Sequence, residues 1–213
     1  MEIRDSAADL PVVQSSAELL STPIFDVVEE TFPFGEEGRT LRRSFVKHLS
    51  AVAVLAVDEQ DRVLLIRQYR HPVRMRLWEI PAGLLDVAGE PMLEAAQREL
   101  AEEADLQAET WHVLSDFYAT PGAHDEAIRI YLAEGLREVP ETELHTRTAE
   151  EAEIETAWVP LAEAVQAVLA GRIHNPSAAN GILALHAVRT GAGQLREARA
   201  PWPEHPRGEA IWP

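Results

Sequence analysis

The sequence predicts an α/β fold, an α/β/α sandwich built over a mixed β-sheet. First, the continuous apolar run at 51–57 is typical of a strand that is buried on both faces. Second, an amphipathic acidic helix at about 91–104 interrupts a series of strands. Third, more strands and then two helices follow that acidic helix. This order of elements favours helices packed against both faces of a sheet.

Strands are expected wherever β-favouring runs lie between turn signals. The first 20 residues are polar and are expected to be irregular. After them, two strands should pair across the turn delimited by Gly35 and Gly38. The strands predicted in this way span 24–34, 41–48, 51–57, 63–69, 111–118, 127–133 and 156–159.

Two helices are expected to close the main domain, at 161–170 and 176–190. The first has an apolar stripe at positions i, i+4, i+7 and i+8. The second begins after Asn175, a favourable N-cap, with Pro176 in its first turn. We therefore expect N-terminal strands within 1–48, a main domain at 49–190, and an extended tail at 191–213 that docks through its tryptophans.

Composition limits the functional classes that fit the chain. It has 213 residues, 46% of them hydrophobic and 26% charged, which suffices for one domain with a full core. Because it contains no cysteine, disulfides and thiolate metal sites are excluded. We expect no membrane span and no secretory signal, and hence a cytoplasmic protein. The net charge of −17 argues against nucleic acid as a partner.

The acidic helix carries Glu99, Glu102 and Glu103 within about a third of its circumference. Leu93 and Leu100 lie on an adjacent stripe that is suited to packing. Like charges three and four residues apart repel each other by about 0.2–0.5 kcal/mol per pair. A bound divalent cation would convert this repulsion into a site, because Mg²⁺ prefers oxygen ligands. The alternative is a solvated acidic face without a ligand.

The stretch from Gly83 to Leu106, GLLDVAGEPMLEAAQRELAEEADL, resembles the Nudix box. The match consists of Gly83, Glu90, Leu106 and the segment RELAEE at 98–103. Six residues separate Gly83 from Glu90 where the family pattern has five. Asp105 stands in place of the second glycine of the box, which is expected to cost some stability, since aspartate tolerates the left-handed region less well than glycine.

Three segments outside the box are similar to the ADP-ribose pyrophosphatase branch of the Nudix superfamily. They are IRQYR at 66–70, WEIPAG at 78–83, and TPG at 120–122 with Glu126. The segment AGLLDVAGEP is similar to actinobacterial members of this branch. The resemblance implies a Nudix fold and the hydrolysis of ADP-ribose to AMP and ribose 5-phosphate, with Mg²⁺ or Mn²⁺ as the cofactor.

The resemblance also implies roles for individual residues. The metal ligands would be the backbone carbonyl of Ala82 and the carboxylates of Glu99, Glu102 and Glu103. Glu103 is thereby one of the catalytic residues. The base that accepts a proton from water would be Glu150 or Glu151, in the acidic loop at 148–155. Arg98 has two interpretations, a partner that orients the acidic cluster or an ordinary surface ion pair.

Four substrate-binding residues follow from the same resemblance: Arg70, Glu79, Gly83 and Glu126. Arg70 would contact a phosphate, because arginine suits bidentate phosphate contacts. Glu79 would accept hydrogen bonds from the nucleoside, and Glu126 would lie close to the diphosphate, with a plain surface role as its alternative. Gly83 would let the loop approach the metal and the phosphate without a Cβ atom.

Finally, the resemblance implies a homodimer in which the N-terminal strands, at about 24–48, are exchanged and contribute to the partner's site. Other functions stay open. The same chemistry could act on another nucleotide sugar or on a dinucleotide. Some Nudix domains are non-catalytic nucleotide-binding modules of transcription regulators, but these carry a basic DNA-binding domain, and the tail of this chain has no excess of basic residues. The intact glutamates of the box favour an enzyme.

Overall fold

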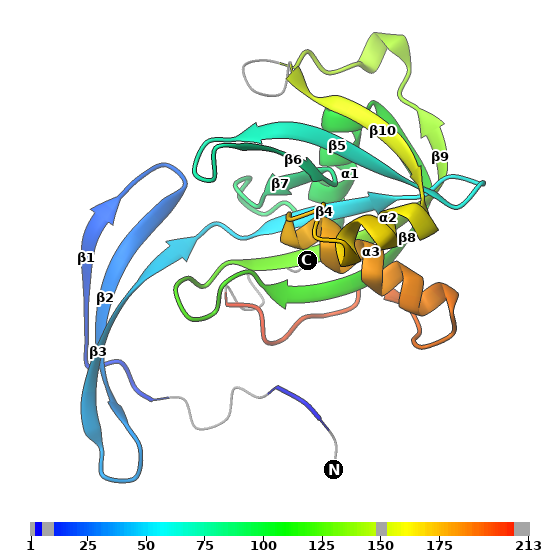
Figure 1. Cartoon of the computed structure of the whole chain (residues 1–213). Coiled ribbons are helices and arrows are strands. Elements are labelled where there is room, and N and C mark those ends of the chain that lie inside the picture. The colour runs from blue at the N-terminus through cyan, green and yellow to red at the C-terminus, as the bar shows by residue number, and fades with distance from the viewer. Residues whose placement is uncertain (1–2, 6–10, 148–152, 207–213) are drawn as a thin grey trace.

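The structure, a computed structural model, describes residues 3–5, 11–147 and 153–206 (Figure 1). At its centre lies a five-stranded mixed sheet in the order β11-β8-β9-β4-β7. Strands β4 and β9 are parallel, and the other neighbours in this sheet are antiparallel. The strands are β4 (Ala51–Ala56), β7 (Ala82–Leu84), β8 (Leu106–Tyr118), β9 (Ala127–Glu138) and β11 (Arg196–Glu197).

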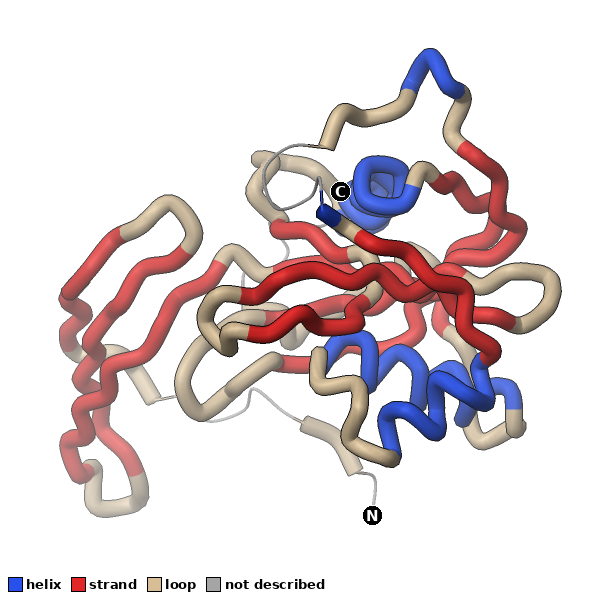
Figure 2. The backbone as a smooth tube through the Cα atoms, turned by 45° about the horizontal axis from the view of Figure 1, so that its top comes forward, coloured by secondary structure: helices blue, strands red, loops and turns tan. Residues whose placement is uncertain are grey.

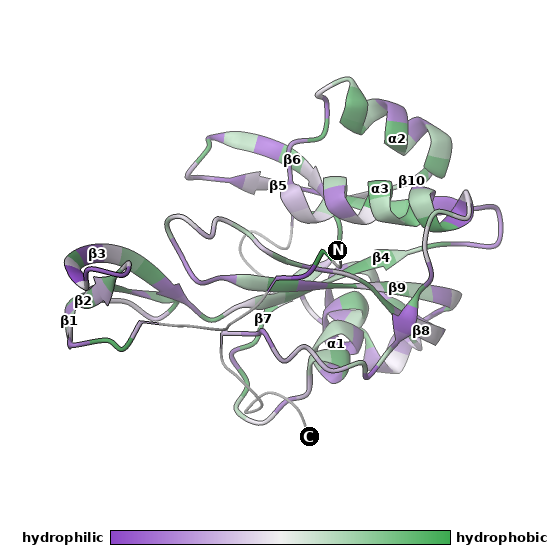
Figure 3. Ribbon diagram, turned by 90° about the horizontal axis from the view of Figure 1, so that it is seen from below, coloured by the Kyte–Doolittle hydropathy of each residue, from purple (hydrophilic) through white to green (hydrophobic). Residues whose placement is uncertain are grey.

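Strand β4 joins the two halves of the hydrophobic core, as its apolar run predicts. All of its residues are buried, and alternate side chains point to opposite faces. Leu55 packs in the core formed with α2 and α3, whereas Val54 packs in the core formed with α1. Figure 3 shows α1 on one side of the sheet and α2 and α3 on the other, which confirms the α/β/α arrangement. The helices are α1 (Met92–Ala104), α2 (Leu161–Leu169) and α3 (Pro176–Arg189).

A second sheet, in the order β10-β5-β6, lies beside the first. Its strands are β5 (Arg62–Arg70), β6 (Met75–Glu79) and β10 (Glu155–Pro160), all antiparallel. After β6 the chain enters β7 of the central sheet, where Ala82 pairs with Ala53. The WEIPAG segment therefore connects the two sheets and brings the end of β6 close to the start of the box.

The N-terminal strands form a third sheet that extends away from the body of the molecule (Figures 1 and 2). It consists of β1 (Ser15–Ser21), β2 (Phe25–Phe34) and β3 (Arg39–His48), paired antiparallel. The expectation that the first 20 residues are irregular is wrong for β1. Every side chain of β1 is exposed, so the strand has no buried face that could appear in the sequence as alternation. Its pairing with β2 is what orders it.

Strands β6 and β11 were also not among the strands expected. Strand β6 begins with the exposed Met75, and both residues of β11 are exposed, so neither has a full apolar face. The tail docks as expected through one tryptophan: Trp202 is 7% exposed and packs in the core on the α1 side of the sheet. Trp212 lies outside the described residues.

Two helix ends agree with the sequence analysis. Asn175 caps α3, since its side chain accepts a hydrogen bond from the backbone nitrogen of Ala178 at 2.9 Å. Helix α1 ends at Asp105, whose φ of 56° lies in the left-handed region. No helix in the described part of the chain is long and apolar enough to cross a membrane.

Candidate active site

Helix α1 presses two of its glutamates against strand β7. Glu99 and Glu103 are only 9% and 7% exposed. The Glu103 carboxylate accepts a hydrogen bond from the backbone nitrogen of Ala82 at 2.8 Å. A Cβ atom on Gly83 would lie 1.9 Å from Cδ of Glu99, so only glycine leaves room for that carboxylate. The structure thus brings Ala82, Gly83, Glu99 and Glu103 together, as the sequence predicts.

Arg98 lies among three carboxylates of the acidic cluster. Its guanidinium makes two hydrogen bonds of 3.0 Å with Glu90, and it lies 2.5 Å from Glu99 and 3.3 Å from Glu102. The hydrogen bonds to Glu90 raise the pKa of Arg98 above its ordinary value. Burial raises the pKa of Glu99, while the charge of Arg98 opposes that shift. Of the two interpretations of Arg98, the geometry favours the residue that orients the cluster.

The donor set of this cluster fits a hard divalent ion. In the described residues, no three histidine, aspartate or glutamate side chains are already arranged as a metal site. However, Glu90, Glu99, Glu102 and Glu103 supply carboxylate oxygens, which Mg²⁺ prefers, on one helix and the loop before it. Arg98 supplies positive charge among them. A metal ion would therefore compete with Arg98 for the oxygens of Glu99 and Glu102.

A cavity of about 600 Å³ adjoins the contact between β7 and α1. Its wall includes Ala82 and Gly83 from β7 and Tyr69 from β5. All four residues expected to bind substrate line this single cavity: Arg70, Glu79, Gly83 and Glu126. The cavity is large enough for a nucleotide-sized ligand.

Arg70 and Glu79 form a bidentate ion pair in the wall of this cavity. Nε of Arg70 donates to one oxygen of Glu79 at 3.0 Å, and Nη2 donates to the other at 2.8 Å. The Glu79 side chain is 2% exposed, whereas that of Arg70 is 42% exposed. Glu79 is therefore anchored, and Arg70 keeps a surface that a ligand can contact.

Glu126 is partly buried and lies between two histidines. Nδ1 of His48 is 3.3 Å from one of its oxygens, and Nδ1 of His124 is 3.8 Å from the other. The backbone nitrogen of His48 also donates to the carboxylate of Asp125 at 2.7 Å. His48 lines the cavity, and the sequence analysis missed it because it lies at the end of an N-terminal strand, outside every motif.

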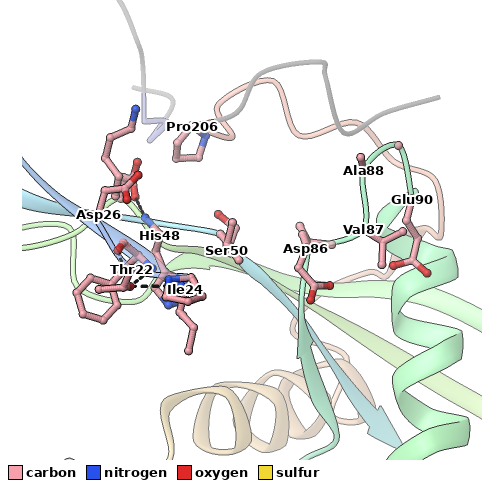
Figure 4. A pocket seen from close by; sticks show the side chains of 17 residues that line it. Thr22, Ile24, Asp26, His48, Ser50, Asp86, Val87, Ala88, Glu90 and Pro206 are labelled. Atoms are coloured by element: carbon pink, nitrogen blue, oxygen red, sulfur yellow. Dashed lines mark hydrogen bonds between the residues drawn. The ribbon is translucent and has the colours of Figure 1, made fainter. Parts of the chain in front are cut away.

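A second cavity, of about 680 Å³, lies between the base of the N-terminal sheet and the loop at 85–90 (Figure 4). Figure 4 shows Asp86 and Glu90 on one side of it and Thr22 and His48 on the other. None of the four expected substrate-binding residues lines this cavity, although His48 lines both. We therefore place the candidate active site at the smaller cavity.

The expected general bases, Glu150 and Glu151, lie outside the described residues. The residues that flank this stretch are described. On one side, Arg147 contacts the C-terminal end of α1. On the other, Glu153 accepts a hydrogen bond from Arg76 of β6 at 2.7 Å.

Comparison with known proteins identifies the family. Residues 47–179 match the NUDIX domain. The chain is 49% identical to an ADP-ribose pyrophosphatase of Mycobacterium tuberculosis over 82% of this chain and 83% of that protein. It is 32% identical to an ADP-ribose pyrophosphatase of Bacillus subtilis over 85% of this chain and 91% of that protein.

A comparison with solved structures supports the α/β fold described above. The crystal structure of an ADP compounds hydrolase superposes with a TM-score of 0.70 at 21% sequence identity, covering 89% of this chain and 99% of that one. Nudix hydrolases generally require a divalent metal ion, which agrees with the oxygen ligands gathered at α1. From the NUDIX match over residues 47–179 and the similarity to the two pyrophosphatases, the chain belongs to the Nudix hydrolase family, in its ADP-ribose pyrophosphatase branch.

Proposed function

We propose that this protein hydrolyses the diphosphate of ADP-ribose to AMP and ribose 5-phosphate in a reaction that depends on Mg²⁺ or Mn²⁺. One observation carries the proposal: Gly83, whose missing Cβ leaves room for the Glu99 carboxylate, lines the same cavity as Arg70 and Glu126. Two relatives that are named ADP-ribose pyrophosphatases support the choice of substrate.

The chemistry of the side chains assigns some residues to metal binding and others to substrate binding. The backbone carbonyl of Ala82, with Glu99, Glu102 and Glu103, would hold the metal. A divalent ion bound there supplies neutralisation of phosphate charge and lowers the pKa of a bound water. Arg70, held by Glu79, presents a guanidinium to the anionic substrate.

Two further roles concern the proton and the diphosphate. Glu150 or Glu151 would accept the proton from the attacking water, because a carboxylate near the metal is a suitable general base. Glu126, flanked by His48 and His124, would lie near the diphosphate, where an imidazole N–H can donate a hydrogen bond to a phosphate oxygen.

We also propose that the protein is a homodimer that forms through the N-terminal strands. Within β1–β3, Val28 alone is a buried hydrophobic residue, and large apolar side chains such as Leu19, Leu20 and Phe34 are exposed. A three-stranded sheet needs a hydrophobic face covered by another element for stability. A second copy of the chain, exchanging residues 1–48, would provide that cover. Sedimentation of the purified protein tests this, with a monomer at micromolar concentration as the contradictory result.

The test of the function is AMP release from ADP-ribose, measured with Mg²⁺, with Mn²⁺ and with a chelator. Metal-dependent AMP is the expected result. The same assay on GDP-sugars and dinucleotides tests the substrate, since preferential cleavage of one of these would keep the chemistry and replace ADP-ribose. Tight binding of nucleotides without cleavage of any of them would identify a non-catalytic binding module instead.

A further inference from the structure

The chain passes from the N-terminal sheet into the central sheet through a short, strained connection. His48 ends β3, and Ala51 begins β4. Between them, Ser50 is 1% exposed and has φ of 63°, a left-handed conformation that residues other than glycine adopt at a steric cost. Its carbonyl accepts a hydrogen bond from the backbone nitrogen of Leu85 at 3.1 Å. Such conformations persist only where several contacts hold them, and they cluster at functional sites.

This connection contacts three consecutive residues where the loop after β8 enters β9. The backbone nitrogen of His48 donates to the carboxylate of Asp125 at 2.7 Å. Nδ1 of His48 lies 3.3 Å from an oxygen of Glu126. Oγ of Ser50 accepts a hydrogen bond from the backbone nitrogen of Ala127 at 3.3 Å. Glu126 is therefore held between two neighbours that the same short connection anchors.

The side chain of His48 faces Glu126 at the wall of the candidate active site. Both residues line the cavity of about 600 Å³ that Arg70 also lines. Nδ1 of His48 is buried beside the carboxylate, which favours this nitrogen as the one that carries a hydrogen. The other neighbouring histidine, His124, has its Nδ1 3.8 Å from the second carboxylate oxygen. Of the two imidazoles, that of His48 is therefore the closer partner of Glu126.

We propose that His48 is a positioning residue that holds the Glu126 carboxylate in the wall of the active site. The two side chains are 18% and 20% exposed, so their contact is mostly shielded from water. Because His48 ends β3, the place of this carboxylate depends on the junction between the N-terminal sheet and the central sheet. Its place matters because moving an active-site group by about 1 Å can lower a rate about a hundredfold. The inference rests on the proposed function, in which Glu126 lies near the diphosphate.

The test compares His48→Asn and His48→Gln with the wild type in the ADP-ribose assay with Mg²⁺. Asparagine carries its amide nitrogen on Cγ, as histidine carries Nδ1, so it can still donate to Glu126. The glutamine amide is one bond farther from the main chain and cannot take the same place. We expect kcat/KM within about threefold of the wild type for His48→Asn, and about tenfold to a hundredfold lower for His48→Gln. His186→Gln, an exposed change on α3, is the matched control and should leave kcat/KM unchanged.

The variant Glu126→Gln separates a positioning role of His48 from a structural one. If His48 acts through Glu126, adding His48→Gln to Glu126→Gln should lower kcat/KM by less than about a further twofold. A residue that only supports the fold would lower kcat/KM by the same factor in both backgrounds. The backbone hydrogen bond from residue 48 to Asp125 is kept in every variant. The rates are compared at a temperature at which circular dichroism shows each variant to be folded.

The outcomes are distinguishable. A wild type that releases no AMP from ADP-ribose with metal would overturn the proposed function and this inference with it. An active wild type with normal kcat/KM in His48→Gln or in Glu126→Gln would overturn the inference alone. Equal losses in His48→Asn and His48→Gln would also overturn it, as would an undiminished effect of His48→Gln in the Glu126→Gln background.

Discussion

Gly83 and Glu99 are so close that a Cβ atom on residue 83 would lie 1.9 Å from the carboxyl carbon of Glu99. The sequence analysis expected Gly83 to clear space for metal and phosphate. In the structure, the space beside Gly83 holds the carboxylate of Glu99, a proposed metal ligand, instead. The box glycine and the first glutamate of the RELAEE segment are therefore a matched pair, set by the packing of β7 on α1.

This contact predicts the effect of Gly83→Ala. The added methyl group must displace the Glu99 carboxylate, so we expect metal-dependent kcat to fall by more than about a hundredfold. Stability should fall by about 1–3 kcal/mol, as for other overpacked sites. Gly193→Ala is the control, because no heavy atom lies within 4 Å of its added Cβ. Equal activities of the two variants would contradict the prediction.

Arg98 should act as a substitute cation in the metal-free protein. In Arg98→Met, Glu90, Glu99 and Glu102 lose their shared counter-charge. Because the Arg98 side chain is 30% exposed, we expect the free energy of unfolding to fall by about 3 kcal/mol or less. This is smaller than the cost of breaking a fully buried ion pair. Mg²⁺ should then raise the melting temperature of Arg98→Met more than that of the wild type. Identical Mg²⁺-dependent shifts would argue against a metal at this cluster.

Substitution of Arg70 separates its structural role from its binding role. Arg70→Met leaves the buried Glu79 without its bidentate partner, so both stability and affinity for ADP-ribose should fall. In the double variant Arg70→Met/Glu79→Met the buried charge is gone, so most of the stability should return. KM should stay raised, because the cation is still missing. A KM that recovers together with stability would show that Arg70 only supports the fold.

A buried ion pair fastens the tail to the sheet. Arg129 is fully buried, and it binds Asp116 through two hydrogen bonds of 2.7 and 2.8 Å. It also donates to the carbonyl of Ala200 at 2.7 Å and lies over the ring of Trp202. Arg129→Met should reduce the free energy of unfolding by up to about 3–5 kcal/mol, because it removes the buried partner of the Asp116 carboxylate and leaves it only the exposed Arg196.

Denaturant titration checks this prediction for the tail. Trp202 fluorescence should move toward that of exposed tryptophan in Arg129→Met before global unfolding. Glu163→Gln, an exposed change on α2, provides the reference. An unchanged unfolding midpoint would mean that the pair contributes nothing to stability.

Much of the fold could be predicted because its signals are local. The apolar run of β4, the Asn175 cap and the left-handed end of α1 at Asp105 depend on neighbouring residues. The box motif likewise concentrates Gly83 and the glutamates that are proposed to bind metal within one short stretch. The residues that cause each of these structures are close together in the sequence, so periodicity and spacing are enough to predict them.

The remainder depends on contacts between distant residues. His48 and Glu126 meet because the end of β3 is hydrogen-bonded to the loop that follows β8. Arg147 reaches Asp105 across more than forty positions, and no pattern in the sequence marks the pair. Strand β1 has no buried face, so only its pairing with β2 defines it. Such features need the tertiary structure.

The most direct test of the central proposal is the rate of AMP release from ADP-ribose by Glu103→Gln in the presence of Mg²⁺. The glutamine can still accept the hydrogen bond from Ala82, so the variant should fold and melt like the wild type. Loss of the charge should lower kcat by more than about a hundredfold, with Glu163→Gln unaffected. A Glu103→Gln variant with wild-type kcat would contradict the metal-dependent mechanism at this helix.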